Sequence, residues 1–423
     1  MKTPSLEEWK ERLRPYLLDL LNPKTPMADV TPEERTRVSH ELDRAAGKNF
    51  KVEWYSALTP TQREALLSAL LDEAFGFGLL DALLKDPSVS EIMVNGPASV
   101  FVERSGQIEA TPLVFDSREQ LMAVVEKLLA YTGRRVTESD PYVDARLADG
   151  SRINIALPAA TLGGPYVTIR KFSRELLSLD RLVQFGSVSP QAAQFLQLCV
   201  QGRMNIVISG AASSGKTTMM NALAQLVPEA ERIVLIEDTA ELQLGKHHAV
   251  RFETRPPNVE GRGEITIRGL LRNALHMRPD RIFVGEVRGE EVLDMLQAMN
   301  TGHDGSMTTV HANSPADVLD RITTMALMAR ADLSSQAIER QVHSAVDLVI
   351  HQERFSDGTR KVTHISEVHS STDRTPLVDL FLLTKHPREA VERLLPTGAR
   401  PSFIERLAKR GLTIPDAVWA LPA

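Results

Sequence analysis

A run of eight residues combines the glycines, the lysine and the hydroxyl side chain that bind the phosphates of a nucleotide. Gly210-Ala211-Ala212-Ser213-Ser214-Gly215-Lys216-Thr217 matches the spacing G-x-x-x-x-G-K-[ST]. Backbone N–H groups of such a loop surround the phosphates, and the helix that follows adds partial positive charge. Lys216 is expected to reach the β- and γ-phosphates, and the Thr217 hydroxyl to ligate Mg²⁺. The predicted nucleotide-binding residues are Gly210, Ser213, Ser214, Gly215, Lys216, Thr217 and Thr218, with Thr217 also the metal ligand.

The segments on either side of this loop have the order that phosphate binding requires. An apolar run at 205–208 precedes the loop, and a helical stretch at 219–223 follows it. Strand, loop and helix in this order are the context in which the motif binds phosphates. A Gly-Ser loop with an incidental lysine is the alternative interpretation, and the flanking segments weigh against it.

Two further apolar runs end in carboxylates. Residues 281–285 lead into Glu286, and residues 233–236 lead into Glu237 and Asp238. At the end of the strand beside the P-loop strand, a carboxylate can orient the attacking water or bind Mg²⁺ through water. Alone, each acid is typical of a solvated strand end, but two of them behind one P-loop favour function. We therefore predict catalytic roles for Glu286 and Glu237.

Two histidines lie in the segment 302–313, namely His303 and His311. A zinc site is disfavoured, because no cysteine or third histidine is nearby. A lone histidine is usually just a hydrogen-bonded polar group, whereas a neutral imidazole beside a nucleotide can sense the γ-phosphate. Both histidines are therefore candidate catalytic residues.

The elements that must position these residues alternate between strand and helix. Strands are expected at 205–209, 233–237, 281–285 and 307–310, and helices at 216–226, 266–277, 289–299 and 314–328. Such alternation predicts a mostly parallel sheet with helices on both faces.

The residues ahead of this region fall into two parts. The chain to residue 76 is helical in pattern, with Thr-Pro helix starts at Thr31 and Thr59; a small bundle and a partner-docking module both fit it. Strands at 91–94, 99–104 and 167–169, a helix at 117–132, and a hairpin closed by Asp149-Gly150 follow. We predict domains at 1–76, 77–180 and 181–423.

Composition and charge limit the class of protein. Of the 423 residues, 43% are hydrophobic and 25% charged, which excludes wholesale disorder. The net charge of −6 disfavours a nucleic-acid coat, which needs a basic surface. Cys199 is the single cysteine, so an intrachain disulfide is excluded and a cytosolic setting is favoured. Neither a membrane-spanning run nor a secretory signal is evident, so any membrane role is expected to be peripheral.

Together these motifs resemble the ATPases of type II secretion, type IV secretion and type IV pilus systems. The resemblance rests on the P-loop, the acidic box 236–241, the Walker B segment 285–288 and the His box 302–313. The chain is most similar to the Tad/Flp pilus assembly ATPase, CpaF-type, through residues 86–97, 255–261 and 294–303. The similarity is strong over about residues 79–368.

The resemblance implies a fold, cofactors, partners and further site residues. The implied fold is α/β, a RecA-like P-loop domain preceded by a small α/β domain and an N-terminal helical region. The implied assembly is a cytoplasmic homohexamer that binds ATP and Mg²⁺ and acts on pilus platform proteins of the inner membrane. Arginines of the N-terminal domain reach the phosphates in such rings, and Arg152 and Arg170 fit that role by position. Arg135 and Arg146 are weaker candidates, and a solvated strand-end arginine is the alternative for each.

The chain departs from the family inside the P-loop. Ala211, Ala212 and Ser213 stand where the family usually has Gly-Thr-Gly, and side chains there stiffen the loop wherever φ is positive. A nucleotide-responsive scaffold with little turnover therefore stands beside the ATP-hydrolysing motor. A RecA-like nucleic-acid motor is the third hypothesis. It rests on the arginines at 251, 255, 262, 268 and 272, and the negative charge and scarce aromatic residues oppose it.

Overall fold

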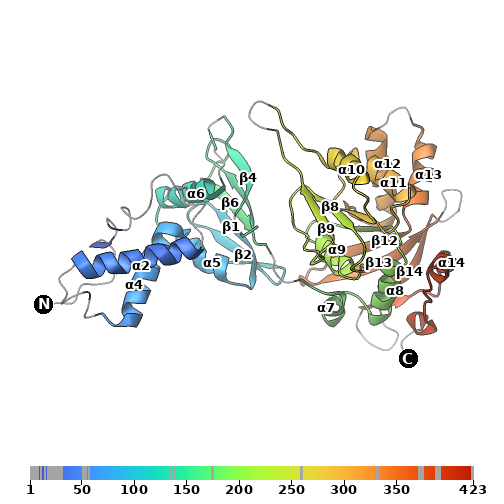
Figure 1. Cartoon of the computed structure of the whole chain (residues 1–423), viewed down its shortest axis with the longest axis horizontal. Helices are drawn as coiled ribbons and strands as arrows, with labels where there is room; N and C mark the ends of the chain where they lie inside the picture. Colours follow the sequence, from blue (N-terminus) through green and yellow to red (C-terminus); the bar gives the residue numbers. More distant parts are fainter. Residues whose placement is uncertain are drawn as a thin grey trace. The chain divides into compact units, whose positions relative to one another are not determined.

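The computed structural model divides into two compact units, residues 1–173 and 174–423 (Figure 1). It describes residues 9, 12–13, 16, 32–49, 55, 58–132, 136–137, 139–147, 149–172, 176–257, 261–329, 333–369, 376–385 and 392–420. Thr31 and Arg135 lie outside the described residues. In the described part, no helix has the length and apolar character needed to cross a membrane.

The first unit combines helices with one antiparallel sheet. Its described helices are α2 (Pro32–Asn49), α4 (Pro60–Phe75), the short 3₁₀ turn η2 (Gly78–Leu80), α5 (Asp81–Lys85) and α6 (Arg118–Thr132). Its described strands are β1 (Val89–Asn95), β2 (Val100–Arg104), β3 (Gln107–Ala110), β4 (Tyr142–Arg146), β5 (Arg152–Ala156) and β6 (Tyr166–Arg170). They pair in the order β3-β2-β1-β6-β5-β4.

Two separate hydrophobic clusters lie within the first unit. Helix α4 begins with the predicted cap: the Gln62 backbone N–H donates to Thr59 Oγ1 at 3.2 Å, and the Thr59 N–H donates to Gln62 Oε1 at 2.9 Å. One cluster joins α2 to α4 through residues such as Leu42 and Leu70, and the other joins α6 to the sheet through residues such as Leu121. This separation fits the predicted boundary at residue 76, which stays a prediction.

The hairpin of β4 and β5 corrects one expectation. Leu147 N–H donates to Ser151 O at 2.9 Å, so the pairing of the two strands ends at Leu147 and Ser151 and not directly beside Asp149-Gly150. Gly150, at φ +93°, supplies the left-handed conformation that the longer turn requires. The strands themselves are confirmed.

The second unit contains helices on both sides of one large sheet. Its described helices are α7 (Leu179–Gln184), α8 (Pro190–Gln201), α9 (Lys216–Ala224), α10 (Ile267–Leu275), α11 (Glu291–Asn300), α12 (Pro315–Ala329), α13 (Ser335–Ala345), α14 (Ile404–Lys409) and the 3₁₀ turn η3 (Asp416–Trp419). Its described strands are β7 (Ile206–Gly210), β8 (Ile233–Glu237), β9 (Ala249–Glu253), β10 (Arg281–Val284), β11 (Met307–His311), β12 (Leu348–Arg354), β13 (Arg360–Val368), β14 (Leu377–Lys385) and β15 (Glu392–Pro396).

The sheet is mixed, with a parallel part that carries the P-loop. The described strands have the order β15-β14-β13-β12-β7-β11-β10-β8-β9. Pairing is parallel from β12 to β9 and antiparallel from β12 to β15. The predicted parallel α/β core is confirmed, and the C-terminal antiparallel strands extend it beyond the prediction.

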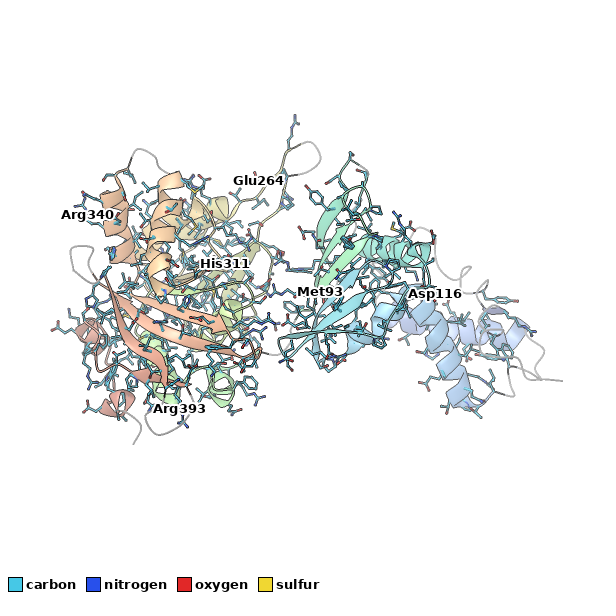
Figure 2. The ribbon with its side chains drawn as sticks, turned by 180° about the vertical axis from the view of Figure 1, so that it is seen from behind. Met93, Asp116, Glu264, His311, Arg340 and Arg393 are labelled. Atoms are coloured by element: carbon cyan, nitrogen blue, oxygen red, sulfur yellow. The ribbon has the colours of Figure 1, made fainter. Side chains whose placement is uncertain are left out.

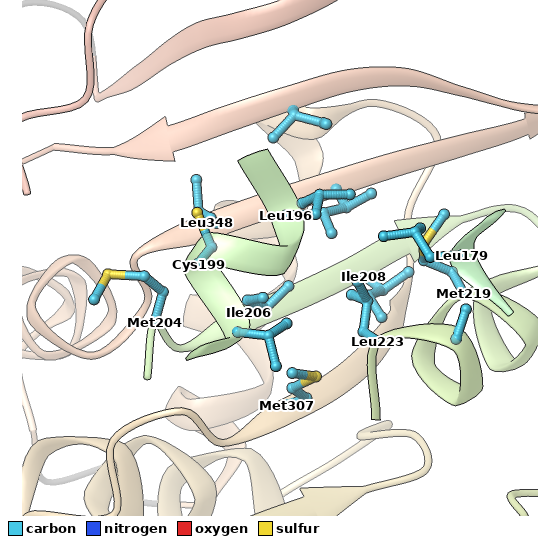
Figure 3. Close-up of a cluster of buried hydrophobic side chains, with 14 of the residues drawn as sticks. Leu179, Leu196, Cys199, Met204, Ile206, Ile208, Met219, Leu223, Met307 and Leu348 are labelled. Atoms are coloured by element: carbon cyan, nitrogen blue, oxygen red, sulfur yellow. The ribbon is translucent and has the colours of Figure 1, made fainter. Parts of the chain in front are cut away.

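Two hydrophobic layers enclose the parallel strands. Helices α8, α9 and α14 belong to one layer, and α10 to α13 belong to the other (Figure 1). Figure 3 shows part of the first layer, where Leu196 and Cys199 of α8 approach Ile206 and Ile208 of β7. Every residue of β7 is buried, so its run is continuously apolar up to Ser209, as expected for a strand covered on both faces. This packing fixes the end of β7, where the P-loop begins.

Candidate active site

The P-loop connects the end of β7 to the start of α9. A Cβ atom built on Gly210 would clash with the backbone oxygen of Gln352, so no side chain fits there. Gly215 precedes α9 at φ +99°, which favours glycine. The two outer glycines of the motif are therefore required by the local geometry.

The inner positions of the loop differ in their strain. Ser213 has φ +58°, whereas Ala211 and Ala212 have no positive φ. Of the three departures from the family pattern, only Ser213 places a side chain on a left-handed residue.

Lys216 lies folded against the loop that it follows. Its side chain is buried, and Nζ donates to Gly210 O at 3.1 Å and to Ala211 O at 2.9 Å. Nζ also lies 3.4 Å from His311 Nδ1. The ammonium group therefore sits at the centre of the loop, where phosphates bind in this motif.

His311 joins this lysine to the acid that follows β10. The histidine ends β11 in the second unit (Figure 2), and its Nε2 lies 2.9 Å from Glu286 Oε1. Glu286 Oε2 accepts a hydrogen bond from Arg288 at 2.7 Å. Lys216, His311, Glu286 and Arg288 thus form a continuous polar chain beside the P-loop.

The surroundings of His311 favour the neutral form of its ring. Burial, followed by the positive charge of Lys216, lowers the pKa of the imidazole, although Glu286 opposes this. A neutral ring with its proton on Nε2 accepts from Lys216 at Nδ1 and faces the Glu286 carboxylate with a donor. The ring can therefore report a change at the P-loop to Glu286.

Replacing His311 with glutamine is expected to weaken the acid sensitivity of the second unit. Folding lowers the pKa of His311 from its usual value of 6.5. As the pH falls below about 6.5, the imidazole is therefore protonated in the unfolded chain before it is protonated in the folded protein. Stability contributed at neutral pH is consequently lost as the pH falls from about 6.5 through the folded pKa. The thermal midpoint, measured from pH 7.5 to 5, should fall more steeply for the wild type than for His311→Gln. Parallel curves would contradict the assignment.

The two glutamates of the acidic box have different environments. Glu237 is buried, and its Oε1 accepts the backbone N–H groups of Glu241 and Leu242, both at 2.8 Å. Burial raises the pKa of Glu237, against these bonds and the Arg251 charge. Glu241 Oε2 instead lies 3.5 Å from Thr217 Oγ1. Glu237 thus holds the segment that presents Glu241, and Glu241, which the sequence analysis did not select, faces the predicted metal ligand.

The strand order corrects the expected position of Glu286. The strand before it, β10, is not the neighbour of β7, because β11 lies between them. His311 is the last residue of this intervening strand and lies directly opposite Gly210 of β7. It therefore occupies the position nearest the P-loop. Glu286 reaches the site through His311.

His303 lies at the opposite end of β11 from the P-loop. Its Nδ1 is 3.3 Å from Ala298 O, and its backbone oxygen accepts from Ser306 at 2.7 Å. The four residue steps from Met307 to His311 span about 13 Å of strand, so the structure does not bring His303 to His311. The candidate catalytic role of His303 finds no geometric support.

The arginines of the first unit form a row on adjacent strands. Arg152 is paired with Arg146 on one side and with Arg170 on the other. Directly opposite residues of an antiparallel pair share a face and lie close together, and like charges there repel. The structure therefore gathers Arg146, Arg152 and Arg170 into one row of arginines, with Glu91 of β1 opposite Arg170 on its other side.

Four of the five arginines behind the nucleic-acid hypothesis contact acidic or backbone groups. Asp294 pairs with Arg268 at 2.8 Å and with Arg272 at 3.0 Å. Arg251 lies 3.5 Å from Glu237, and Arg255 donates to a backbone oxygen at 3.0 Å. Three of the five charges thus face carboxylates, which weighs against the continuous basic stripe that nucleic acid requires.

Two residues beside the P-loop have no signal in the sequence. Arg360 Nε donates to Ser213 O at 2.8 Å, from a strand 147 residues away along the chain. Gln352, on β12, is buried and lies opposite Gly210 of β7. No motif surrounds either residue, so only the fold reveals their position.

Comparison with known proteins gives a consistent relationship. Residues 73–392 match the family model of the type II/IV secretion system protein. A putative conjugal transfer protein of Mycobacterium tuberculosis is 34% identical over 330 residues, which cover 77% of this chain and 93% of that protein. The type IV secretion system protein VirB11 of Brucella suis is 34% identical over 313 residues, which cover 67% and 86% of the two chains. The solved ATPase DotB of Yersinia pseudotuberculosis has a TM-score of 0.50 at 17% identity, covering 72% and 80%.

Proposed function

We propose, since this chain belongs to the type II/IV secretion ATPase family and is an ATP hydrolase, that it is a hexameric motor for assembly of a Tad/Flp-type type IV pilus. The motor would work at the cytoplasmic face of the inner membrane, on platform proteins that add or remove pilin subunits. The observation that carries the proposal is the polar chain of Lys216, His311 and Glu286, with separations of 3.4 and 2.9 Å, at the P-loop. The CpaF-type stretches at 86–97, 255–261 and 294–303 favour the Tad/Flp pilus among secretion systems.

The proposed roles follow from these contacts. Gly210, Gly215 and the first turn of α9, with Thr218, would hold the phosphates, and Lys216 would neutralise the β- and γ-phosphates. Glu286 would accept a proton from the attacking water. His311 would hold that carboxylate in a fixed position relative to the P-loop.

The predicted metal ligand has a suitable neighbour. The Thr217 hydroxyl and the Glu241 carboxylate are 3.5 Å apart, and oxygen donors of these kinds fit Mg²⁺, which usually keeps several waters. Bound there with ATP, Mg²⁺ would neutralise charge that develops on the phosphates. Glu241 would then act through water, held in place by Glu237.

The arginine row of the first unit gives the proposed ring its additional phosphate contacts. Arg152 and Arg170 are cross-strand neighbours, and their planar groups pair bidentately with phosphate oxygens. We propose that one of them stabilises the transferred phosphate during hydrolysis.

The scaffold hypothesis is favoured by one observation, the left-handed Ser213 in the P-loop. It predicts tight ATP binding and ATP-dependent assembly with hydrolysis near background. A steady-state turnover measurement on the purified hexamer decides between the two, because a motor hydrolyses ATP continuously.

Deleting this chain from its host is expected to abolish Tad/Flp pili and leave conjugal DNA transfer unchanged. Re-expressing the wild type should restore pili, whereas Lys216→Ala should not, because the motor needs its nucleotide. Pili are counted by electron microscopy, and the mass of the purified chain with a non-hydrolysable ATP analogue tests the hexamer. Loss of DNA transfer with normal pili would instead assign the chain to conjugation.

A further inference from the structure

We infer that Arg360 is a positioning residue that holds the P-loop of this chain in its phosphate-binding conformation. The inference rests on the proposed ATP site and concerns the one inner loop residue that is strained. Arg360 begins β13 and belongs to none of the motifs of the site.

The strain lies at Ser213. Its φ of +58° is left-handed, and a residue with a Cβ is disfavoured there roughly tenfold or more relative to ordinary conformations. Glycine carries no such penalty. An additional contact is therefore needed to keep the loop of this chain in the conformation that a glycine would adopt unaided.

Arg360 makes that contact. Its Nε–H donates to Ser213 O at 2.8 Å, so it fixes the peptide plane that follows the strained residue. Its stem also covers Gly215, since a Cβ built on that glycine would lie 3.4 Å from Arg360 Cδ. One side chain thus contacts the loop before and after Ser214.

The hairpin that carries Arg360 is itself firmly anchored. Strand β12 pairs with β7 up to Gln352 and Gly210, and the hairpin closes through a hydrogen bond from Phe355 N–H to Thr359 O at 2.8 Å. The backbone of Arg360 accepts a 2.6 Å hydrogen bond from the Ser187 hydroxyl. The guanidinium is therefore presented from a fixed base, as a positioning residue requires.

The energetic consequence is a change in apparent affinity. If Arg360 only selects the competent loop, its loss lowers the fraction of chains able to bind ATP, and the apparent affinity falls by that fraction. Turnover of the bound complex then changes little. A direct contact of the guanidinium with the phosphates would act regardless of the residue at 213.

A double-mutant cycle tests this distinction in the purified full chain. The variants are Arg360→Met, which keeps the apolar stem and removes the donors, Ser213→Gly, and both together. Lys361→Met is the matched control, because Lys361 is next on the strand and lies instead over the Phe355 ring at 5.2 Å. KM for ATP and kcat are measured for each, with melting temperatures to confirm folding.

The effect of Arg360→Met on KM is expected to depend on whether residue 213 is serine or glycine. Arg360→Met should raise KM about tenfold with kcat within about threefold, and the same change in the Ser213→Gly background should raise KM by no more than about threefold. An equal loss in both backgrounds, or an unchanged KM, would overturn the inference. Failure of the proposed function is a separate result, since it appears as normal pili in the deletion strain, whereas this inference is decided by the ATP affinity of the purified variants.

Discussion

Lys216→Ala is expected to reduce ATP hydrolysis by about 10²–10³-fold, a typical cost of removing one group that stabilises transition-state charge. The ammonium group lies within 3.1 Å of two P-loop carbonyls, at the place where the triphosphate is to be held. Alanine removes both the positive charge that would face the phosphates and the contact to His311. Affinity for ATP should therefore fall together with turnover, measured by phosphate release and by titration with a fluorescent nucleotide.

Lys409→Ala provides the matched control for this loss. Lys409 ends α14 on the exposed surface of the same unit, so the same substitution should leave hydrolysis unchanged. The melting temperature of Lys216→Ala must also be measured, because Lys216 is buried. Full activity in a folded Lys216→Ala variant would remove the P-loop from the catalytic site.

The parallel core was predictable because its strands are buried on both faces. Strand β7 is fully buried, and such strands are continuous apolar runs between turn signals, which a sequence reveals directly. The antiparallel strands β13 and β14 mix buried and half-exposed positions. Their apolar residues follow no single period, and no motif marks them. The sequence analysis also missed two parallel strands: β9, which is half-exposed, and β12, whose buried apolar run is only three residues long.

The site was predictable where chemistry depends on neighbours along the chain. The P-loop and His311 belong to local motifs, and the structure brings them together at the carboxyl ends of the adjacent parallel strands β7 and β11. Glu241 was not selected because residue spacing does not tell which of two nearby carboxylates forms buried backbone hydrogen bonds. Arg360 was not found because it reaches Ser213 only through the order of β7, β12 and β13.

Glu286→Gln is expected to reduce hydrolysis by about 10²–10³-fold and to leave ATP binding largely intact. The amide has nearly the same shape, so the contacts to His311 at 2.9 Å and to Arg288 at 2.7 Å can be partly retained. It cannot accept a proton from water as the carboxylate does. Affinity and turnover should therefore separate in this variant, whereas they fall together in Lys216→Ala.

Two further glutamine substitutions identify the base. Glu290→Gln is the matched control, because Glu290 pairs with Arg268 at the surface four residues along the chain and should keep full activity. Glu241 faces Thr217 at 3.5 Å. Glu241→Gln is therefore expected mainly to raise the Mg²⁺ concentration needed for half-maximal hydrolysis, with a smaller effect on the limiting rate. If Glu286→Gln instead retains more than about a tenth of the wild-type rate while Glu241→Gln loses 10²-fold, Glu241 is the base and Glu286 only orients His311. Comparing both variants at saturating ATP and Mg²⁺ separates these assignments, because a defect in metal binding is then overcome and a missing base is not.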